Sequence, residues 1–228
     1  MRFNFSYLLD CLRFGIKYLP VTIKLAFIPF ALSVIIGTLI AMVRFFKVPV
    51  VSKFFDIFIP FYIGIPVMVE LLIYNLIYLT MMKPVANGSI MVAYFTFTIG
   101  RSCATSETIR GAFEAVPKGQ YESSYACGLS FWQTLRRIII PQEIPVALPS
   151  LTNSMVGAIK NTSIVLVLGI NDVLNGALIP CNETYSFLEG YVAAAIIYWI
   201  FGALMEFLFN SFEKALTKNR NGGKKFYG

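Results

Sequence analysis

The feature that most constrains this chain is a series of long apolar segments. The hydrocarbon core of a bilayer, about 30 Å thick, is crossed by about 20 largely apolar residues in a helix. Five segments satisfy this requirement. Their predicted limits are residues 20–43, 54–80, 90–109, 144–170 and 191–212. We therefore predict an all-α, multi-pass integral membrane protein with about five transmembrane helices.

The composition agrees with a membrane protein. Of 228 residues, 57% are hydrophobic and 14% charged, whereas soluble domains average about 25% charged residues. Residues 1–19 carry charged and aromatic side chains along their whole length, so we expect an amphipathic helix at the membrane interface and not a cleaved signal peptide. No histidine and no CxxC pair occur, which predicts neither a metal site nor a disulfide framework. A chance pairing of Cys11 with Cys181 remains open.

The distribution of basic residues predicts the orientation. The tail, residues 213–228, is strongly basic and is expected in the cytoplasm, which places the N-terminus outside. The expected cytoplasmic segments hold Arg44, Lys47, Lys53, Arg110, Lys118, Arg136, Arg137, Lys214, Lys218, Arg220, Lys224 and Lys225. The expected external segments hold only Arg2, Arg13, Lys17 and Lys83. This orientation places the segment of residues 111–143 in the cytoplasm.

That cytoplasmic segment predicts two short capped helices. Pro117 suits a first helical position, and Gly128 suits the left-handed residue that ends the first helix. Ser130 with Gln133 makes a capping box for a second helix, which Pro141 is expected to end. Three interpretations compete: a hairpin without a partner, a DNA-binding helix–turn–helix, and a docking element for a cytoplasmic protein. The DNA-binding motif needs a third helix and a free basic face, for which the segment has no room, so no nucleic-acid partner is expected.

The same segment resembles the EAA loop of ABC importer permeases. The family pattern E-A-A-x3-G-x9-I-x-L-P matches Glu122-Ser123-Ser124, Gly128 and Ile138-x-Ile140-Pro141 in spacing, with Ser in place of both alanines and Ile in place of Leu. The flanking stretches IRGAFEAVPKGQYE, RRIIIPQEIPVALPSLTN and KNTSIVLVLGI resemble the polar amino-acid group of that family. The resemblance extends from about residue 100 to residue 170 in detail.

The resemblance implies a type I permease fold and a role for the loop as a coupling helix in a groove of a separate ATPase. By position, Pro117, Glu122, Ser123, Ser124, Gly128 and Pro141 would form the coupling element. The chain has no GxxxxGK[ST] loop, so we do not expect an enzyme. No cofactor is expected on this chain, and ATP with Mg²⁺ would be used by the partner. Expected partners are two ATPase subunits, a second permease chain that is identical or different, an extracellular substrate-binding protein and membrane lipid.

Charged and polar residues at membrane depth mark a candidate substrate pathway, because such residues are costly there. The candidates are Glu70, Arg101, Lys160, Asn161, Thr162 and Ser163. Glu70 and Lys160 are opposite in charge, so they could instead pair with each other. We also expect Pro60, Gly64 and Pro66 to interrupt the second segment, where freed backbone groups would either line a cavity or form packing kinks.

The most concrete prediction is a plasma-membrane permease subunit that imports a polar amino acid. The family commonly has Asp where this chain has Asn161, and often Gln where it has Glu70, which puts a simple transfer of substrate contacts in doubt. The run NGALIPCNETYSFLEGYVAAAIIYW resembles cystine-type members, so cystine or another zwitterionic amino acid is favoured. The alternatives are a secondary transporter driven by an ion gradient, whose inverted repeat we do not find, and a membrane scaffold whose loop recruits another protein.

Overall fold

The computed structural model describes residues 3–82, 85–86 and 88–221, with side chains as far as Lys214. Within these residues the chain is helical and has no strand. The α-helices are α1 Phe5–Lys17, α2 Leu19–Phe45, α3 Val51–Ile63, α4 Val67–Met81, α5 Gly88–Glu114, α6 Lys118–Ala126, α7 Phe131–Thr134, α8 Ile140–Asn161, α9 Val173–Leu178, α10 Cys181–Thr184 and α11 Phe187–Asn221. A π-helical segment, η1 Leu135–Ile139, precedes α8, and a 3₁₀ segment, η2 Thr162–Leu168, follows it.

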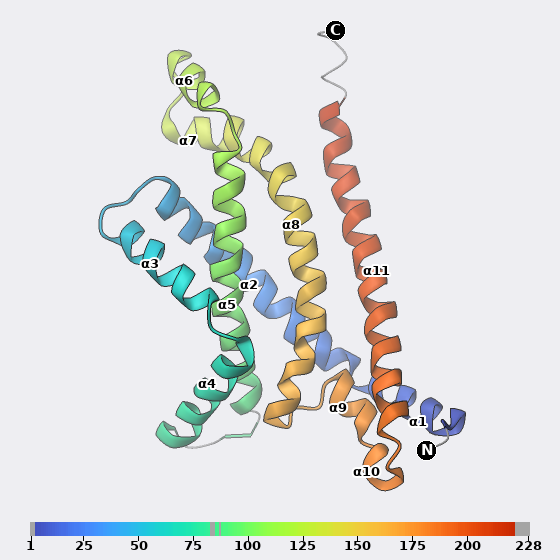
Figure 1. The fold of residues 1–228 in the computed structure, drawn as a ribbon. Coiled ribbons are helices and arrows are strands. Elements are labelled where there is room, and N and C mark those ends of the chain that lie inside the picture. The colour runs from blue at the N-terminus through green and yellow to red at the C-terminus, as the bar shows by residue number, and fades with distance from the viewer. Residues whose placement is uncertain (1–2, 83–84, 87, 222–228) are drawn as a thin grey trace.

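Helix α5 lies at the centre of the bundle. It packs along α2 and also contacts α3, α4 and α8, while α11 packs against α8, α9 and α1. The loop helices α6 and α7 lie at one end of the molecule, and α1, α9 and α10 lie at the opposite end (Figure 1). The predicted coupling loop and the N-terminal helix are therefore on opposite ends, as the proposed membrane orientation requires.

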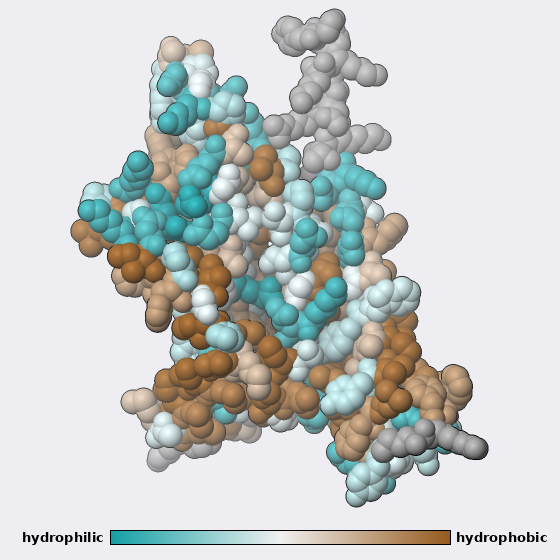
Figure 2. All heavy atoms as spheres, viewed as in Figure 1, coloured by the Kyte–Doolittle hydropathy of each residue, from teal (hydrophilic) through white to brown (hydrophobic). Residues whose placement is uncertain are grey.

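The outer surface fits a membrane protein. Three helical stretches of the described residues are long and apolar enough to cross a bilayer: Leu19–Phe45, Phe131–Leu168 and Phe187–Lys214; the pair α3 and α4 would make a fourth. Figure 2 shows hydrophobic residues over α4 and the lower part of α11, and hydrophilic residues near α6 and α7. Helix α5 covers the predicted third span but carries Arg101, Glu107 and Arg110 among small polar residues, so five spans stay a prediction.

The predicted second span, 54–80, is interrupted, as its proline and glycine residues led us to expect. It is divided into α3 and α4, which meet at an angle of 103°. Pro66 is the N-cap of α4, with ψ of 130°; it cannot donate a backbone hydrogen bond and disfavours helical geometry at Ile65. The break expected at Gly64 and Pro66 is confirmed. Pro60 lies inside α3, so the break expected there is wrong.

The expected end of the second loop helix at Pro141 is also wrong. Pro141 lies in the first turn of α8, and helix continues from Phe131 through η1 into α8. In η1 the Ile140 amide donates to the Leu135 carbonyl, five residues back. This wider turn gives room for the proline ring, which would otherwise meet the carbonyl four residues before it. The loop and the fourth span are thus mechanically continuous.

The N-terminal helix predicted within residues 1–19 is present as α1. It buries Leu8, Cys11 and Gly15 against α9 and α11, while Phe5 and Leu9 are exposed. A Cβ at Gly15 would lie 2.6 Å from Ile197 Cδ1, so glycine permits this close approach. Helix α1 is therefore packed on the bundle and also presents an apolar face outward, as an interfacial helix would.

The Cys11 Sγ lies 3.6 Å from the Cys181 Sγ, and both are free, buried thiols. Of the predicted basic tail, 213–228, the backbone is helical as far as Asn221. Residues 222–228, with Lys224 and Lys225, lie outside the described residues, as do Arg2 and Lys83.

Candidate functional site

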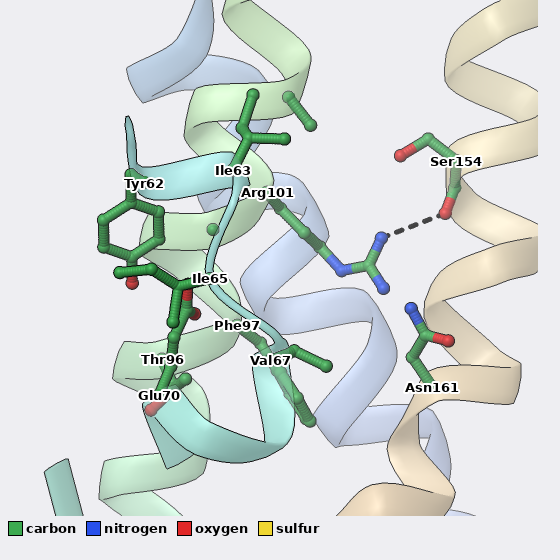
Figure 3. Close-up of a pocket in the computed structure, with 12 residues that line it drawn as sticks. Tyr62, Ile63, Ile65, Val67, Glu70, Thr96, Phe97, Arg101, Ser154 and Asn161 are labelled. Atoms are coloured by element: carbon green, nitrogen blue, oxygen red, sulfur yellow. Dashed lines mark hydrogen bonds between the residues drawn. The ribbon is translucent and has the colours of Figure 1, made fainter. Parts of the chain in front are cut away.

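A cavity of about 230 Å³ lies beside the break between α3 and α4. The connecting residues Ile63, Ile65 and Val67 form one wall, α5 forms another, and α8 closes the far side (Figure 3). The break expected from Gly64 and Pro66 therefore lines a cavity, which was one of the two possibilities left open by the sequence.

Glu70 contributes the negative charge of the cavity. It lies in the first turn of α4 and is 5% exposed, and a carboxylate is favoured there by the partial positive charge of the helix N-terminus. The Tyr62 hydroxyl interacts with the Glu70 carboxyl and lies 3.4 Å from the Tyr74 hydroxyl. A Cβ at Gly100 would lie 3.6 Å from Glu70 Oε2, so the backbone of α5 comes close to this carboxylate.

Arg101 contributes the positive charge. It extends from α5 toward α8, and its Nη1 donates a hydrogen bond of 3.0 Å to the Ser154 carbonyl (Figure 3). Asn161, two turns beyond Ser154 on α8, presents its amide on the same side of the cavity. A guanidinium, an amide and a carboxylate thus surround a space that is also lined by apolar side chains such as Phe97 and Ile65 and by the hydroxyl-bearing Tyr62 and Thr96.

The remaining sequence candidates do not line this cavity. The Lys160 Cε is 4.0 Å from where a Cβ at Gly202 would be, so Lys160 faces α11. The Thr162 hydroxyl donates to the Ile159 carbonyl at 2.8 Å, and the Ser163 hydroxyl donates to the Lys160 carbonyl at 2.9 Å. Consecutive helical residues point about 100° apart, which separates Lys160 from Asn161. No ion pair between Glu70 and Lys160 occurs among the described residues, so that pairing is wrong.

Several lining residues were missed. On α5, Phe97 and Ala104 lie one turn from Arg101 on the same face, and Thr96 and Gly100 lie one turn apart on the adjoining face; helical periodicity around Arg101 could have found the first two. Ser154 lies seven residues before Asn161 and could have been found in the same way. Tyr62 had no such signal, because its approach depends on the angle between α3 and α4.

The predicted coupling loop has the expected caps. Gly128 has φ of +76°, the Gly128 amide donates to the Tyr125 carbonyl at 2.9 Å, and the Leu129 amide donates to the Ser124 carbonyl at 3.1 Å. These two bonds make a Schellman motif. The capping box of Ser130 with Gln133 is present. Pro117 was expected as the first residue of this helix, but it is the N-cap, and α6 begins one residue later at Lys118.

The candidate docking residues lie on α6. Glu122 and Ser123 are exposed, whereas Ser124 is buried, and the Ser124 hydroxyl donates to the Gln120 carbonyl at 2.6 Å. The exposed residues of α6 therefore include the acidic Glu122 and the small Ser123, together with Lys118, Gln120 and Tyr125.

An aromatic and aliphatic cluster fixes this loop to the bundle. Phe45 of α2 stacks on Phe113 of α5 with ring centroids 5.1 Å apart, and Phe46 meets Phe131 of α7 at 4.8 Å. Leu135 and Ile139 complete the buried cluster. The cluster therefore packs α6 and α7 against α2, α5 and the start of α8.

Among the described residues, no group of three or more histidine, cysteine, aspartate or glutamate side chains could hold a metal ion.

The sequence is similar to known transport proteins. Residues 33–218 match the family described as binding-protein-dependent transport system inner membrane component. A probable amino-acid ABC transporter permease protein, PatM of Vibrio harveyi, is 32% identical over 87% of this chain and 90% of its own length. The L-cystine transport system permease protein TcyL of Bacillus subtilis (strain 168) is 30% identical over 89% of this chain and 87% of its own length.

Solved structures have the same fold. The crystal structure of an amino acid ABC transporter with histidines contains a chain with a TM-score of 0.84 and 29% identity, covering 94% of this chain and all of that one. The inward-facing MetNI methionine ABC transporter gives a TM-score of 0.74 at 16% identity, covering 95% of this chain and all of that one, which is a likeness of fold alone.

Proposed function

Since the chain belongs to the binding-protein-dependent transport system inner membrane components, we propose that it is the permease subunit of an ATP-driven importer of a polar amino acid. The observation that carries the substrate class is the cavity, where Arg101 and Glu70 offer opposite charges beside an apolar lining. The relatives whose names refer to amino-acid transport support the same class.

The proposed contacts follow from charge. The Arg101 guanidinium and the Asn161 amide receive the substrate carboxylate, because a guanidinium presents several donors to a carboxylate. Glu70 receives the ammonium group. A zwitterion uses both groups, whereas a purely cationic substrate would leave Arg101 unneutralised. Cystine is our first choice among zwitterions because of the resemblance to cystine-type members and the similarity to TcyL.

The proposed coupling uses the capped loop. The exposed Glu122 and Ser123 dock α6 in a groove of the ATPase, the buried Ser124 packs α6 against its own chain, and Gly128 holds the turn to α7. Closure of two ATPase subunits on ATP and Mg²⁺ moves two docked loops, and the continuous helix from Phe131 to α8 carries the motion to the cavity wall. Pro141 accommodates this continuity through the π-helical turn and does not end the helix.

The proposed assembly is a pair of permease chains with two ATPase subunits and an external binding protein. The coupling loop and C-terminus lie in the cytoplasm and the N-terminus lies outside, as the basic residues indicate. The chain itself binds no cofactor in this scheme.

Reconstitution tests the proposal. The chain, its partner ATPase and its binding protein are placed in proteoliposomes, and uptake of labelled cystine is measured with and without ATP, against a panel of cationic, acidic and neutral amino acids. ATP-dependent uptake of a zwitterion supports it. Uptake that ignores ATP but follows an ion gradient would instead support a secondary transporter. Failure to bind any ATPase, with no uptake, would support a scaffold.

A further inference from the structure

A second cavity, of about 540 Å³, lies at the connection between α2 and α3. Its walls are that connection, the first turn of α3, the last turn of α5 and the first residue of α6. It is separate from the cavity at Glu70 and Arg101, with which it shares no lining residue.

The charges around this second cavity are unequal. Its carboxylates are engaged by arginines: Arg44 Nε donates to Asp56 Oδ1 at 2.8 Å, and Arg110 Nη1 donates to Glu114 Oε1 at 2.5 Å. Three further lining cations, Lys47, Lys53 and Lys118, are exposed and form no ion pair with any described carboxylate. The cavity therefore presents uncompensated positive charge, which favours an anion.

An apolar surface begins at the edge of this cavity. Val50 is 79% exposed, and Phe54, Ile57 and Phe61 of α3 are 57%, 76% and 70% exposed. Their spacing of four, three and four residues places them along one side of the helix. Figure 2 shows hydrophilic residues over the α2–α3 connection bordering hydrophobic ones over α3. An anion bound in the cavity would thus have an apolar path beside it, as a phospholipid requires.

The connection is also strained. Lys47 has φ of 53° and Val50 has φ of 68°, and left-handed geometry is especially unfavourable for a β-branched residue such as Val50. The Val48 amide donates to the Val43 carbonyl at 3.1 Å, and the Ser52 amide donates to the Val48 carbonyl at 3.0 Å, which holds the turn. Such strain clusters at ligand-binding segments, and here it lies between the unpaired lysines.

We propose that this cavity binds the phosphate headgroup of an anionic phospholipid, with its acyl chains along the exposed side of α3. The lining residues Arg110 and Glu114 lie at the end of α5 that leads into the coupling loop, so the lipid belongs to the cytoplasmic leaflet if the proposed orientation holds. Free inorganic phosphate could bind the same cavity, but only a phospholipid also contacts the apolar side of α3.

Measuring the lipid that stays bound to the purified protein tests the proposal directly, without a transport assay. The full chain, with its assembly partners, is purified in detergent with phosphatidylglycerol or phosphatidylcholine, and bound lipid is measured by native mass spectrometry. Wild type should retain phosphatidylglycerol in preference. The double variant Lys47→Gln/Lys53→Gln should weaken that retention about 30-fold, from about 1 kcal/mol for each lysine near an anionic surface. The matched control, Lys17→Gln/Lys24→Gln, removes the same amount of charge from α1 and α2, away from this cavity. This control should retain phosphatidylglycerol as wild type does.

Equal retention by the two double variants, or equal retention of both lipids by wild type, would overturn the proposal. Addition of inorganic phosphate at millimolar concentration should displace little lipid; full displacement would show that the cavity is a free-phosphate site. A melting temperature measured in phosphatidylcholine should be the same for both variants, which separates lost binding from lost folding. These results do not depend on whether the cargo is an amino acid.

Discussion

Arg44 Nη1 donates a hydrogen bond of 2.6 Å to Glu107 Oε1, joining the last turn of α2 to α5 where 7% of the arginine side chain is exposed. The same guanidinium also reaches Asp56 of α3. Three helices therefore meet at one buried cation, directly below the loop that we assign to the ATPase. Ion pairs of Arg44 with Asp56 and Glu107 thus join the three helices at this end of the bundle.

Replacing Arg44 with Ala should strongly destabilise the protein. Asp56 would lose its arginine partner, while Glu107 would keep only its contact with Arg110; each lost hydrogen bond between charged groups costs about 1.5–3 kcal/mol, less where the carboxylate is exposed. The measurement is the thermal unfolding midpoint of the purified protein in detergent. Arg13→Ala is the matched control, because Arg13 has an 81% exposed side chain and a 3.7 Å contact with Asp10, worth about 0–1 kcal/mol. Similar melting temperatures for the two variants would contradict the role of Arg44.

Replacing Gly128 with Val should impair coupling without a steric clash. A Cβ there meets no atom within 4 Å, but φ is +76°, and left-handed geometry costs an L-residue about 1–2 kcal/mol. The turn would open and misplace α6. ATP-driven uptake should fall while the variant still folds. Gly119→Val is the control, since Gly119 also has open space and lies within helical α6. Normal uptake by the Gly128 variant would refute the assigned turn.

Local chemistry predicted much of this loop and less of the cavity. The left-handed Gly128, the Ser130 box and the break at Pro66 depend on neighbouring residues, which the sequence displays. The π-helical turn before Pro141 and the 103° angle between α3 and α4 depend on packing against α5 and were not predicted. Lys160 and Asn161 were predicted to act together because they are adjacent in the sequence. On a helix, adjacent residues point in different directions, so Asn161 lines the cavity and Lys160 faces α11.

That separation gives a prediction for the two adjacent residues. Asn161→Ala should raise the KM for uptake about tenfold or more, because it removes a polar group from the cavity, and a hydrogen bond to a charged ligand is worth about 1.5–3 kcal/mol. Lys160→Gln should leave KM nearly unchanged, because Lys160 faces α11. Initial uptake rates over a range of substrate concentrations decide between them. A larger effect from Lys160 would restore the pathway role inferred from sequence.

Replacing Glu70 with Gln should alter substrate affinity. The variant keeps the size of the side chain but removes the charge proposed for the substrate ammonium group, so we expect KM to rise about tenfold or more for a zwitterion. A substrate analogue without an ammonium group should lose its disadvantage in this variant. Glu206→Gln, an exposed carboxylate on α11, serves as the control. Unchanged kinetics with every substrate would assign Glu70 a purely structural role.

Thiol labelling tests the packing of α1 on the bundle. Cys127 is exposed, whereas Cys11, Cys103 and Cys181 are buried, and burial beside Cys181 raises the pKa of Cys11 to about 12. Only a thiolate reacts readily with maleimide, so at pH 8 the folded protein should take one label on Cys127 and four after denaturation. Because the raised pKa favours the neutral thiol, the contribution of Cys11 to stability is complete below the ordinary thiol pKa, about 8.5. This contribution should decline as the pH rises from about 8.5 toward 12, because the Cys11 thiol then ionises in the unfolded protein but stays protonated in the folded one. Rapid labelling of Cys11 in the folded protein at pH 8 would show that α1 is not docked against α9 and α11, whereas the Cys127→Ser variant should take no label at all until it unfolds.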